Sequence, residues 1–398
     1  MFITFSFEMS SFVRSLFLTL ILFFFANVPY VCGKDINRLW NIQNLDYAKN
    51  HTEKFNDVVR TCIEKGKESS KLEPFSIVVK NKTFAPDLHY YCSLSPYYWP
   101  VNNDDGTIVY VYRDGQVNPD ASNYNRWSLT ELSIRLHRMA LAFYFSEDVL
   151  IFKSFVRQLD VWFLDRDTRM YPNFDYAQVI PGVNDNHGTS AGIIEANPLT
   201  TIIESICLVD SCRSIGSIRR YRIKKWFSRF LEWMQSSDLC KDMANSKNNI
   251  GTSVNVTLLR IALFTEAGDV AGQLMDPFAK RIESQIDQEG KQPLELKRTK
   301  AYHYSTQNLR FIIEFCLIAH SAGISIYESH KDLINSAASY LYQFVGEESK
   351  FPYSQLGGFA SEEKVLSVVL KCIDNLDGEK RMPEKISSIN DLILCHVY

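Results

Sequence analysis

The sequence has no excess of charge of either sign. It holds 43 Lys and Arg residues against 46 Asp and Glu residues in a chain of 398, a formal net charge of -3. Proteins that bind nucleic acid usually carry a basic field, so this balance excludes that class of partner. Any attraction for an acidic ligand must therefore be local. The 46% of hydrophobic residues can bury a large core, which excludes a disordered chain.

A hydrophobic run long enough to span a membrane is also missing. The apolar stretch 16–26 follows Arg14 and ends shortly before Pro29. A spanning helix needs about 20 such residues, so this layout is typical of a signal peptide. We expect residues 1–33 to be removed, the protein to be secreted, and no membrane association beyond the signal peptide.

The cysteines show no spacing typical of a metal site. None forms a CxxC pair and no histidine lies near them at ligand intervals, so we expect no metal. Loss of residues 1–33 would leave eight cysteines in an oxidising compartment, where disulfides persist, although their pairing cannot be deduced. These are Cys62, Cys92, Cys207, Cys212, Cys240, Cys316, Cys372 and Cys395. Asn50, Asn81 and Asn255 begin glycosylation motifs, which predict a glycoprotein if the host is eukaryotic and the sites are exposed.

Alternation typical of strands is nearly absent, and apolar residues recur instead at spacings of three and four. We expect an irregular N-terminal segment over 34–125, with one helix near 56–65, and a helical domain over 126–398. Ser128 and Glu131 have the spacing of a capping box that begins a helix. Further helices are predicted over 148–164, 199–208, 218–234, 252–266, 277–288, 306–322, 331–344 and 361–374. The fold class is therefore all-α.

Several longer motifs follow one another between residues 87 and 309. They are HYYCSLSPYYWP (89–100), RDGQVNP (113–119), WFL with M, PN and YAQ (162–178), WF with FL, W and S (226–237), NN (248–249) and QPLEL with RT, YS and NL (292–309). Their order and aromatic content resemble the alginate lyase family of polysaccharide lyases. Several matches in order are more specific than any single motif.

This resemblance implies an incomplete α/α toroid, built from helical hairpins in a ring, with a cleft that binds an anionic polysaccharide. It also implies β-elimination at a uronic acid. The proton to be removed lies next to a carboxylate and is very weakly acidic, so the enzyme must neutralise that carboxylate and stabilise the charge that moves onto it. Amide and cationic side chains can do both.

The resemblance also implies the site residues. Asn248 and Asn249 would neutralise the carboxylate, Tyr304 would act as acid and base, Arg298 would support the charge, and Gln178 would line the cleft. A free phenol is a poor base near neutral pH, so we expect Arg298 to lower the pKa of Tyr304. Since residues six apart cannot converge from one helix, we expect Ser305 to cap a helix, with Tyr304 at its mouth and Arg298 on the preceding loop.

One position departs from the family. The family reads N-N-H, whereas Ile250 follows the two asparagines here. Isoleucine can neither carry a proton nor donate a hydrogen bond from its side chain, so another residue must supply that role. His303 and His187 are the candidates. Either the chain is a lyase restricted to the stereochemistry that Tyr304 can serve alone, which we favour, or it binds glycan without cleaving it.

Several candidate residues also have a structural interpretation. Tyr97, Tyr98 and Trp99 could stack on sugar rings or simply pack together. Asn248 and Asn249 form an ordinary sequence for the start of a helix. Six basic residues could steer a polyanion, but on an amphipathic helix they usually form a solvated face. They are Arg219, Arg220, Arg222, Lys224, Lys225 and Arg229.

The leading interpretation is therefore a secreted lyase, acting on alginate, glucuronan or a similar polymer. Its catalytic set is Tyr304, Asn249, Asn248, Arg298 and His303, and its substrate-binding set is Gln178, His187, Tyr97, Tyr98, Trp99 and Gln292. No cofactor is required, and we expect a monomer. The alternatives are an inactive glycan-binding protein on the same scaffold and a helical glycoside hydrolase, which would need two carboxylates that flank the scissile bond.

Overall fold

The computed structural model describes residues 42–79 and 82–377. The predicted signal peptide, Asn81 and Cys395 lie outside these residues. The longer helices are α2 (Ile42–Asn50), α3 (Asn56–Lys71), α4 (Arg126–Ser146), α5 (Val149–Leu159), α6 (Pro198–Cys212), α7 (Ser217–Ser236), α9 (Asn249–Phe264), α11 (Met275–Gln285), α13 (Ala301–Ser321), α14 (Tyr327–Tyr342) and α15 (Ala360–Leu376). Shorter helices are α8 (Asp238–Ala244), α10 (Gly268–Gln273) and α12 (Pro293–Leu296).

Every helix predicted from the apolar spacing is present, which confirms the all-α class. Two predicted helix starts are wrong. Helix α4 begins at Arg126, so Ser128 is a buried residue within it, and α13 begins at Ala301, so Ser305 lies in its second turn. The hydroxyl of Ser305 has no hydrogen-bond partner among the described residues, and the carbonyl of that residue accepts a hydrogen bond from Gln292 at 2.9 Å. Both serines are buried within helices, so neither caps a helix.

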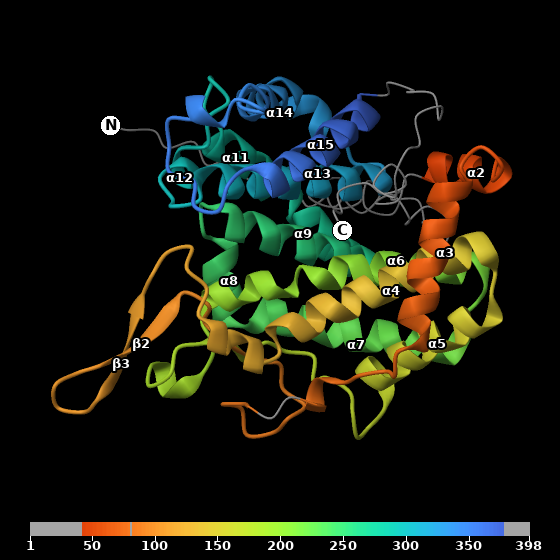
Figure 1. Ribbon diagram of the computed structural model, residues 1–398, viewed down its shortest axis with the longest axis horizontal. Helices are drawn as coiled ribbons and strands as arrows, with labels where there is room; N and C mark the ends of the chain where they lie inside the picture. Colours follow the sequence, from red (N-terminus) through yellow and green to blue (C-terminus); the bar gives the residue numbers. More distant parts are fainter. Residues whose placement is uncertain (1–41, 80–81, 378–398) are drawn as a thin grey trace, which may run out of the picture.

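The helices pack in a curved series (Figure 1). Helix α4 packs between α3 and α6, α6 contacts α9, α9 contacts α13, and α13 contacts α15. Helices α5, α7 and α14 pack against members of this series. Most side chains of α9 and α13 are buried, because these two helices contribute to the main hydrophobic core on several sides.

Long apolar helices can also be membrane-spanning helices. Among the described residues, no single helix is long and apolar enough to cross a bilayer. One bent pair, Asn184–Ala196 with Pro198–Cys212, passes that test together by length and composition alone. In the structure, α6 is almost wholly buried against neighbouring helices.

The N-terminal part is more ordered than the sequence predicted. It holds α2 and α3, and two small sheets that were not foreseen. Strand β1 (Cys92–Leu94) pairs in parallel with β4 (Tyr176–Val179), and β2 (Tyr98–Asn102) pairs with β3 (Ile108–Tyr112) in an antiparallel hairpin. This hairpin projects from the helical body at the left of Figure 1.

Among the described residues, the cysteines do not form the disulfides expected for a secreted chain. All seven cysteines among the described residues are free thiols, and five of them are buried. Of the predicted glycosylation sites, Asn50 is exposed. Asn255 is only 7% exposed and its side-chain oxygen accepts a hydrogen bond from Arg281 at 2.9 Å. Asn255 is therefore not a glycosylation site in the folded protein.

Candidate active site

Tyr304 lies in the first turn of α13, at the side of the helical body that carries the β2–β3 hairpin. Its hydroxyl is 3.1 Å from the hydroxyl of Tyr97, which precedes β2. The guanidinium carbon of Arg298 lies 4.0 Å from the centre of the Tyr304 ring. Arg298 is on the turn between α12 and α13, as the spacing predicted. The structure therefore brings a phenol and a cation together from the two ends of one short turn.

Arg298 is fixed by Asp114, which lies on the loop after β3. Two hydrogen bonds join the guanidinium to this carboxylate, at 2.7 and 3.2 Å, and Asp114 also accepts from the amide and hydroxyl of Thr299. Burial raises the pKa of Asp114, but the hydrogen bonds from Arg298 and Thr299 outweigh burial and hold it well below the usual range. A bidentate pair of this kind sets the plane of the guanidinium as well as its position.

The pKa of Tyr304 is set mainly by burial. Burial raises it well above the usual range and the hydrogen bond with Tyr97 adds to the rise, while the charge of Arg298 lowers it by less. Only 6% of Tyr304 is exposed, which explains why burial dominates. Arg298 therefore lowers the pKa of this phenol, as expected, but burial outweighs its effect.

The two asparagines at the start of α9 have different environments. Asn248 is the N-cap, and its side-chain oxygen accepts hydrogen bonds from the amide of Ile250 at 3.1 Å and the hydroxyl of Ser246 at 2.9 Å. Asn248 therefore caps the helix, which is the structural role that the sequence around it predicted. Asn249 is 3% exposed, and its side-chain oxygen has no hydrogen-bond partner among the described residues. A buried amide oxygen without a partner is unusual.

Glu295 links Asn249 to the turn that carries Arg298. Its Oε1 accepts a hydrogen bond from the amide of Asn249 at 2.7 Å, and its Oε2 has no partner among the described residues. The carboxyl is 2% exposed, and burial raises its pKa to about 7, against the lowering effects of the Asn249 amide and Arg298. Sequence reasoning missed this residue, although it lies within the QPLEL motif.

Gln292 makes its hydrogen bonds within the protein. It is 2% exposed, and both ends of its amide are occupied, because it donates to the carbonyl of Ser305 and accepts from Asn308 at 2.9 Å. These contacts support the beginning of α13. The predicted role of Gln292 in substrate binding stays a prediction.

Gln178 has a strained backbone beside the same region. Its φ is +52°, which is uncommon for a residue other than glycine and often marks a functional position. Its amide donates to Glu195 at 3.0 Å, and Glu195 also accepts hydrogen bonds from Tyr91 and Ser93. Glu195 was not foreseen from the sequence. Gln178 is 7% exposed, so its side chain contributes little open surface.

The two histidine candidates occupy different places. His303, next to Tyr304, packs its ring edge-on against the Tyr304 ring at 5.1 Å, and its Nδ1 lies 3.0 Å from Oε1 of Glu362 on α15. His187 is exposed on the loop after β4, where it stacks on Tyr176. No contact joins His187 to Tyr304 or Arg298 among the described residues. Only His303 lies beside the tyrosine.

The remaining aromatic candidates belong to the hairpin. The ring of Tyr98 contacts Tyr112 at 5.4 Å, while Trp99 donates to the carbonyl of Gln116 and lies under the guanidinium of Arg113. Both Tyr98 and Trp99 are partly exposed. Tyr98 thus packs on its own strand partner, and both rings keep some exposed surface. The packing interpretation of this cluster holds, and stacking on sugar rings stays a prediction.

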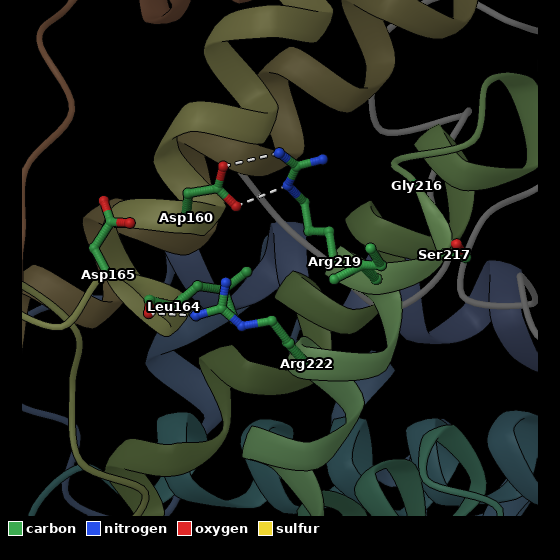
Figure 2. A pocket seen from close by; sticks show the side chains of 8 residues that line it. Asp160, Leu164, Asp165, Gly216, Ser217, Arg219 and Arg222 are labelled. Carbon is green, nitrogen blue, oxygen red and sulfur yellow. Dashed lines mark hydrogen bonds and ion pairs between the residues drawn. The ribbon is translucent and has the colours of Figure 1, made fainter.

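A pocket of about 350 Å³ lies elsewhere, between the π-turn Asp160–Leu164 and the start of α7 (Figure 2). Its charged side chains largely satisfy one another: Arg219 makes a double hydrogen bond to Asp160, and Arg222 donates to the carbonyl of Leu164. None of the residues that line this pocket belongs to the predicted catalytic set. The Tyr304 region remains the candidate site because the chemistry converges there.

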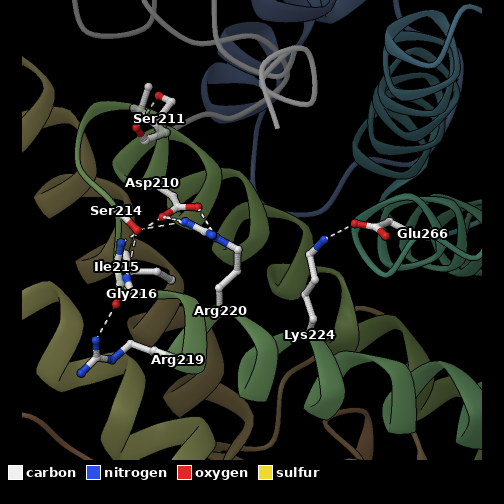
Figure 3. Close-up of polar contacts among 10 residues, drawn as sticks. Asp210, Ser211, Ser214, Ile215, Gly216, Arg219, Arg220, Lys224 and Glu266 are labelled. Atoms are coloured by element: carbon white, nitrogen blue, oxygen red, sulfur yellow. Dashed lines mark hydrogen bonds and ion pairs between the residues drawn. The ribbon is translucent and has the colours of Figure 1, made fainter. Parts of the chain in front are cut away.

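Half of the six basic residues of α7 form ion pairs, two of which are drawn in Figure 3. Arg220 makes two hydrogen bonds to Asp210 on the preceding helix, and Lys224 pairs with Glu266. Together with the Arg219 pair, these contacts neutralise half of the six cations that could steer a polyanion. The structure favours the interpretation of this run as a solvated outer face.

Comparisons with known proteins identify the family and the fold. The sequence matches the alginate lyase family over residues 78–351. The structure is similar to an alginate lyase from Bacteroides ovatus, with 30% identity, a TM-score of 0.81, and coverage of 86% of this chain and 92% of that one. No curated protein matches the sequence.

More distant structures share the fold. Alginate lyase A1-III from Sphingomonas species A1 has 12% identity and a TM-score of 0.51, with coverage of 82% of this chain and 83% of that one. A histidine-to-alanine variant of alginate lyase A1-III, complexed with a tetrasaccharide, has 13% identity and a TM-score of 0.56, with 82% coverage of each chain. At such identities the likeness shows the fold alone. The expected α/α toroid is confirmed.

Proposed function

This chain belongs to the alginate lyase family of polysaccharide lyases, and we propose that it cleaves an anionic uronic-acid polymer by β-elimination beside Tyr304. The proposal is supported chiefly by one observation: the Tyr304 phenol, the Arg298 guanidinium and the Asp114 carboxylate meet at the beginning of α13. These groups come from distant parts of the chain.

The reaction needs a proton removed from the carbon next to the sugar carboxyl group. The electron pair of that carbon–hydrogen bond becomes a carbon–carbon double bond, and the glycosidic carbon–oxygen bond breaks. The departing oxygen then takes a proton. Tyr304 is the proposed acid and base of this sequence, because its hydroxyl is the titratable group at the centre of the set.

The substrate carboxylate must be neutralised before the proton becomes acidic enough to leave. Arg298 is the proposed main support, because its charge is fixed in place by Asp114 and needs little reorganisation. The amide of Asn249 is the second candidate, since its oxygen lacks a partner and a small rotation would let its nitrogen donate. Asn248 is a weaker candidate because its oxygen already caps α9.

The polymer itself, the secretion of the protein and its monomeric state are part of the proposal. The A1-III variant holds a tetrasaccharide, which supports an oligosaccharide ligand for this fold. The leader-like residues 1–33 support secretion. The alternative function is glycan binding without cleavage, and the replacement of the family histidine by Ile250 favours it.

The test measures the ultraviolet absorbance of the unsaturated product on a panel of alginate, its mannuronate-rich and guluronate-rich fractions, and glucuronan. The wild-type protein should generate signal on at least one polymer. Tyr304→Phe should lower kcat by about 100-fold or more, because it removes the only proton that the phenol can transfer. Tyr221→Phe, on the exposed face of α7, is the matched control and should keep full activity.

The outcomes separate the two functions. Signal that survives in Tyr304→Phe rejects the assignment of the acid and base. Absence of signal on every polymer, together with measurable binding of the same polymers by calorimetry, replaces the lyase with the glycan-binding protein. Thermal unfolding of Tyr304→Phe and Tyr221→Phe shows whether a loss of activity in Tyr304→Phe comes from a loss of stability, because the two variants should then unfold at different temperatures.

A further inference from the structure

A segment beyond the family match braces the turn that carries the candidate site. The match ends at residue 351, and the chain then runs alongside residues 299–303. The amide of Ala301 donates to the carbonyl of Ser354 at 2.9 Å, and the amide of Leu356 donates to the carbonyl of Thr299 at 3.0 Å. The side chain of Gln355 accepts from the amide of His303 at 3.2 Å. These contacts hold the backbone just before Tyr304.

Helix α15, which follows this segment, adds a side-chain contact. Oε1 of Glu362 lies 3.0 Å from Nδ1 of His303, and Ser361 donates to the same oxygen at 2.9 Å. Glu362 is 7% exposed, while about a third of the His303 side chain is open. A buried carboxylate thus holds Nδ1 of a partly exposed imidazole. The other nitrogen, Nε2, has no hydrogen bond to any described residue.

Burial and hydrogen bonding decide which partner of this pair donates the hydrogen bond. Burial raises the pKa of Glu362, but the hydrogen bond and charge of His303 outweigh it, so that the pKa lies below the usual range. An ionised carboxylate can only accept, so the hydrogen must lie on Nδ1 of His303. The charge of His303 acts on Glu362 only in the imidazolium, in which both ring nitrogens carry a hydrogen. Once the ring has lost its Nε2 hydrogen, Nε2 is a lone-pair acceptor, which is the arrangement that a carboxylate imposes on a general-base histidine.

We propose that His303 takes over from Tyr304 the role of the base, that Tyr304 remains the acid of the elimination, and that Glu362 is the positioning residue that fixes the His303 tautomer. This inference rests on the proposed lyase function. Nε2 of His303 takes the proton next to the sugar carboxyl group, and the electron pair forms the double bond. The glycosidic oxygen leaves with its bonding pair and takes the hydroxyl proton of Tyr304. Proton exchange with solvent returns both residues to their starting states.

Two further observations favour this division of roles. Tyr304 is nearly buried and shares its hydroxyl hydrogen bond with Tyr97, which suits a group that holds a proton until the leaving oxygen needs it. Ile250 cannot serve as a base, so the histidine must come from another element. His303 lies beside the tyrosine on the same turn.

A double-mutant cycle tests the assignment. His303→Gln should lower kcat by about 100-fold, and Glu362→Ala by about 10-fold with KM little changed. Because Glu362 acts through His303, the double variant should be no slower than His303→Gln alone. Glu362→Gln keeps an acceptor for Nδ1–H and should recover most of the activity that Glu362→Ala loses.

A spectroscopic readout tests the pair without activity. In protein labelled with ¹⁵N-histidine, the resonances of neutral His303 should show the hydrogen on Nδ1 in wild type and Glu362→Gln, and a mixture of tautomers in Glu362→Ala. Glu283→Ala is the matched control, because Glu283 forms a second glutamate–histidine pair, 3.4 Å from His330, that does not involve His303. It should change neither kcat nor the His303 spectrum.

The results separate this inference from the proposed function. Full activity in His303→Gln, or losses that multiply in the double variant, would overturn the assigned roles while leaving the lyase intact. A hydrogen on Nε2 of wild-type His303 would overturn the role of Glu362. Wild-type protein that cleaves no polymer would refute the lyase and the assigned base together, whereas the tautomer spectrum would still establish or refute the Glu362 contact.

Discussion

Glu295 offers a quantitative test of the electrostatics beneath the candidate site. Its carboxyl is 2% exposed, and one oxygen accepts the Asn249 amide at 2.7 Å. Burial raises its pKa from 4.5 to about 7. Between these two values the folded protein holds a proton that the unfolded chain has already released.

The sign of the pH dependence follows from this proton. Folding is favoured by the raised pKa in full below about pH 4.5, and that contribution is lost as the pH rises through about 7. Each pKa unit corresponds to about 1.4 kcal/mol. The free energy of unfolding should therefore fall by about 3 kcal/mol across this window because of Glu295 alone.

Glu295→Gln isolates the effect. The amide oxygen of glutamine can still accept from Asn249, but the side chain cannot ionise. The variant and the wild type should have similar free energies of unfolding near pH 4.5, and the variant should be more stable by about 3 kcal/mol near pH 8. Urea unfolding followed by circular dichroism at several pH values measures this difference.

The exposed Glu283 provides the control, since its side chain is 64% exposed. Glu283→Gln should give a stability curve parallel to that of the wild type. Parallel curves for Glu295→Gln would refute the reasoning, because they would mean that the carboxyl is solvated or paired in the folded protein. A variant that is less stable than the wild type at every pH would mean that the glutamine nitrogen cannot be accommodated.

Three further predictions concern the site and its support. Tyr97→Phe removes a hydrogen bond that raises the pKa of Tyr304, so any fall in kcat at alkaline pH that reflects loss of the Tyr304 proton should begin at lower pH; an unchanged pH profile would contradict this. Gly192→Ala places a methyl group 2.4 Å from the carbonyl oxygen of Ala177, and thermal unfolding should show a loss of about 1–3 kcal/mol. Ile250→His, at a half-buried position, should keep the fold and broaden or raise activity on the polymer panel; insoluble protein would show that Ile250 is needed for packing.

The helices could be predicted from the sequence because their apolar spacing coincides with burial in the core. In α13, Leu309, Ile312, Ile313 and Cys316 are all fully buried. Helix ends were harder to predict, since Ser128 and Ser305 look like caps yet lie inside helices. A hydroxyl can cap only where the preceding backbone leaves the helix, and packing against other elements decides that.

The acids of the site could not be predicted in the same way. Asp114, Glu295 and Glu362 each act on a residue that is distant in sequence, and their roles depend on which loops the toroid brings together. Asp114 and Glu295 lie within quoted motifs, which was a usable signal. Glu362 had none. The proximity of Arg298 and Tyr304 followed from their spacing, whereas the pKa of Tyr304 depends on burial that only the folded chain reveals.

The two asparagines at the start of α9 show how one motif divides between fold and chemistry. The oxygen of Asn248 is used by α9 itself, so its nitrogen is the only part free for a ligand. Asn249 is buried with an unpartnered oxygen and is tied by its backbone to Glu295. Because Asn248 caps α9, Arg298 and Asn249 are the groups that remain to neutralise a sugar carboxylate. Replacement of Asn248 by aspartate, which also caps helices well, should therefore cost less activity than the same replacement at Asn249.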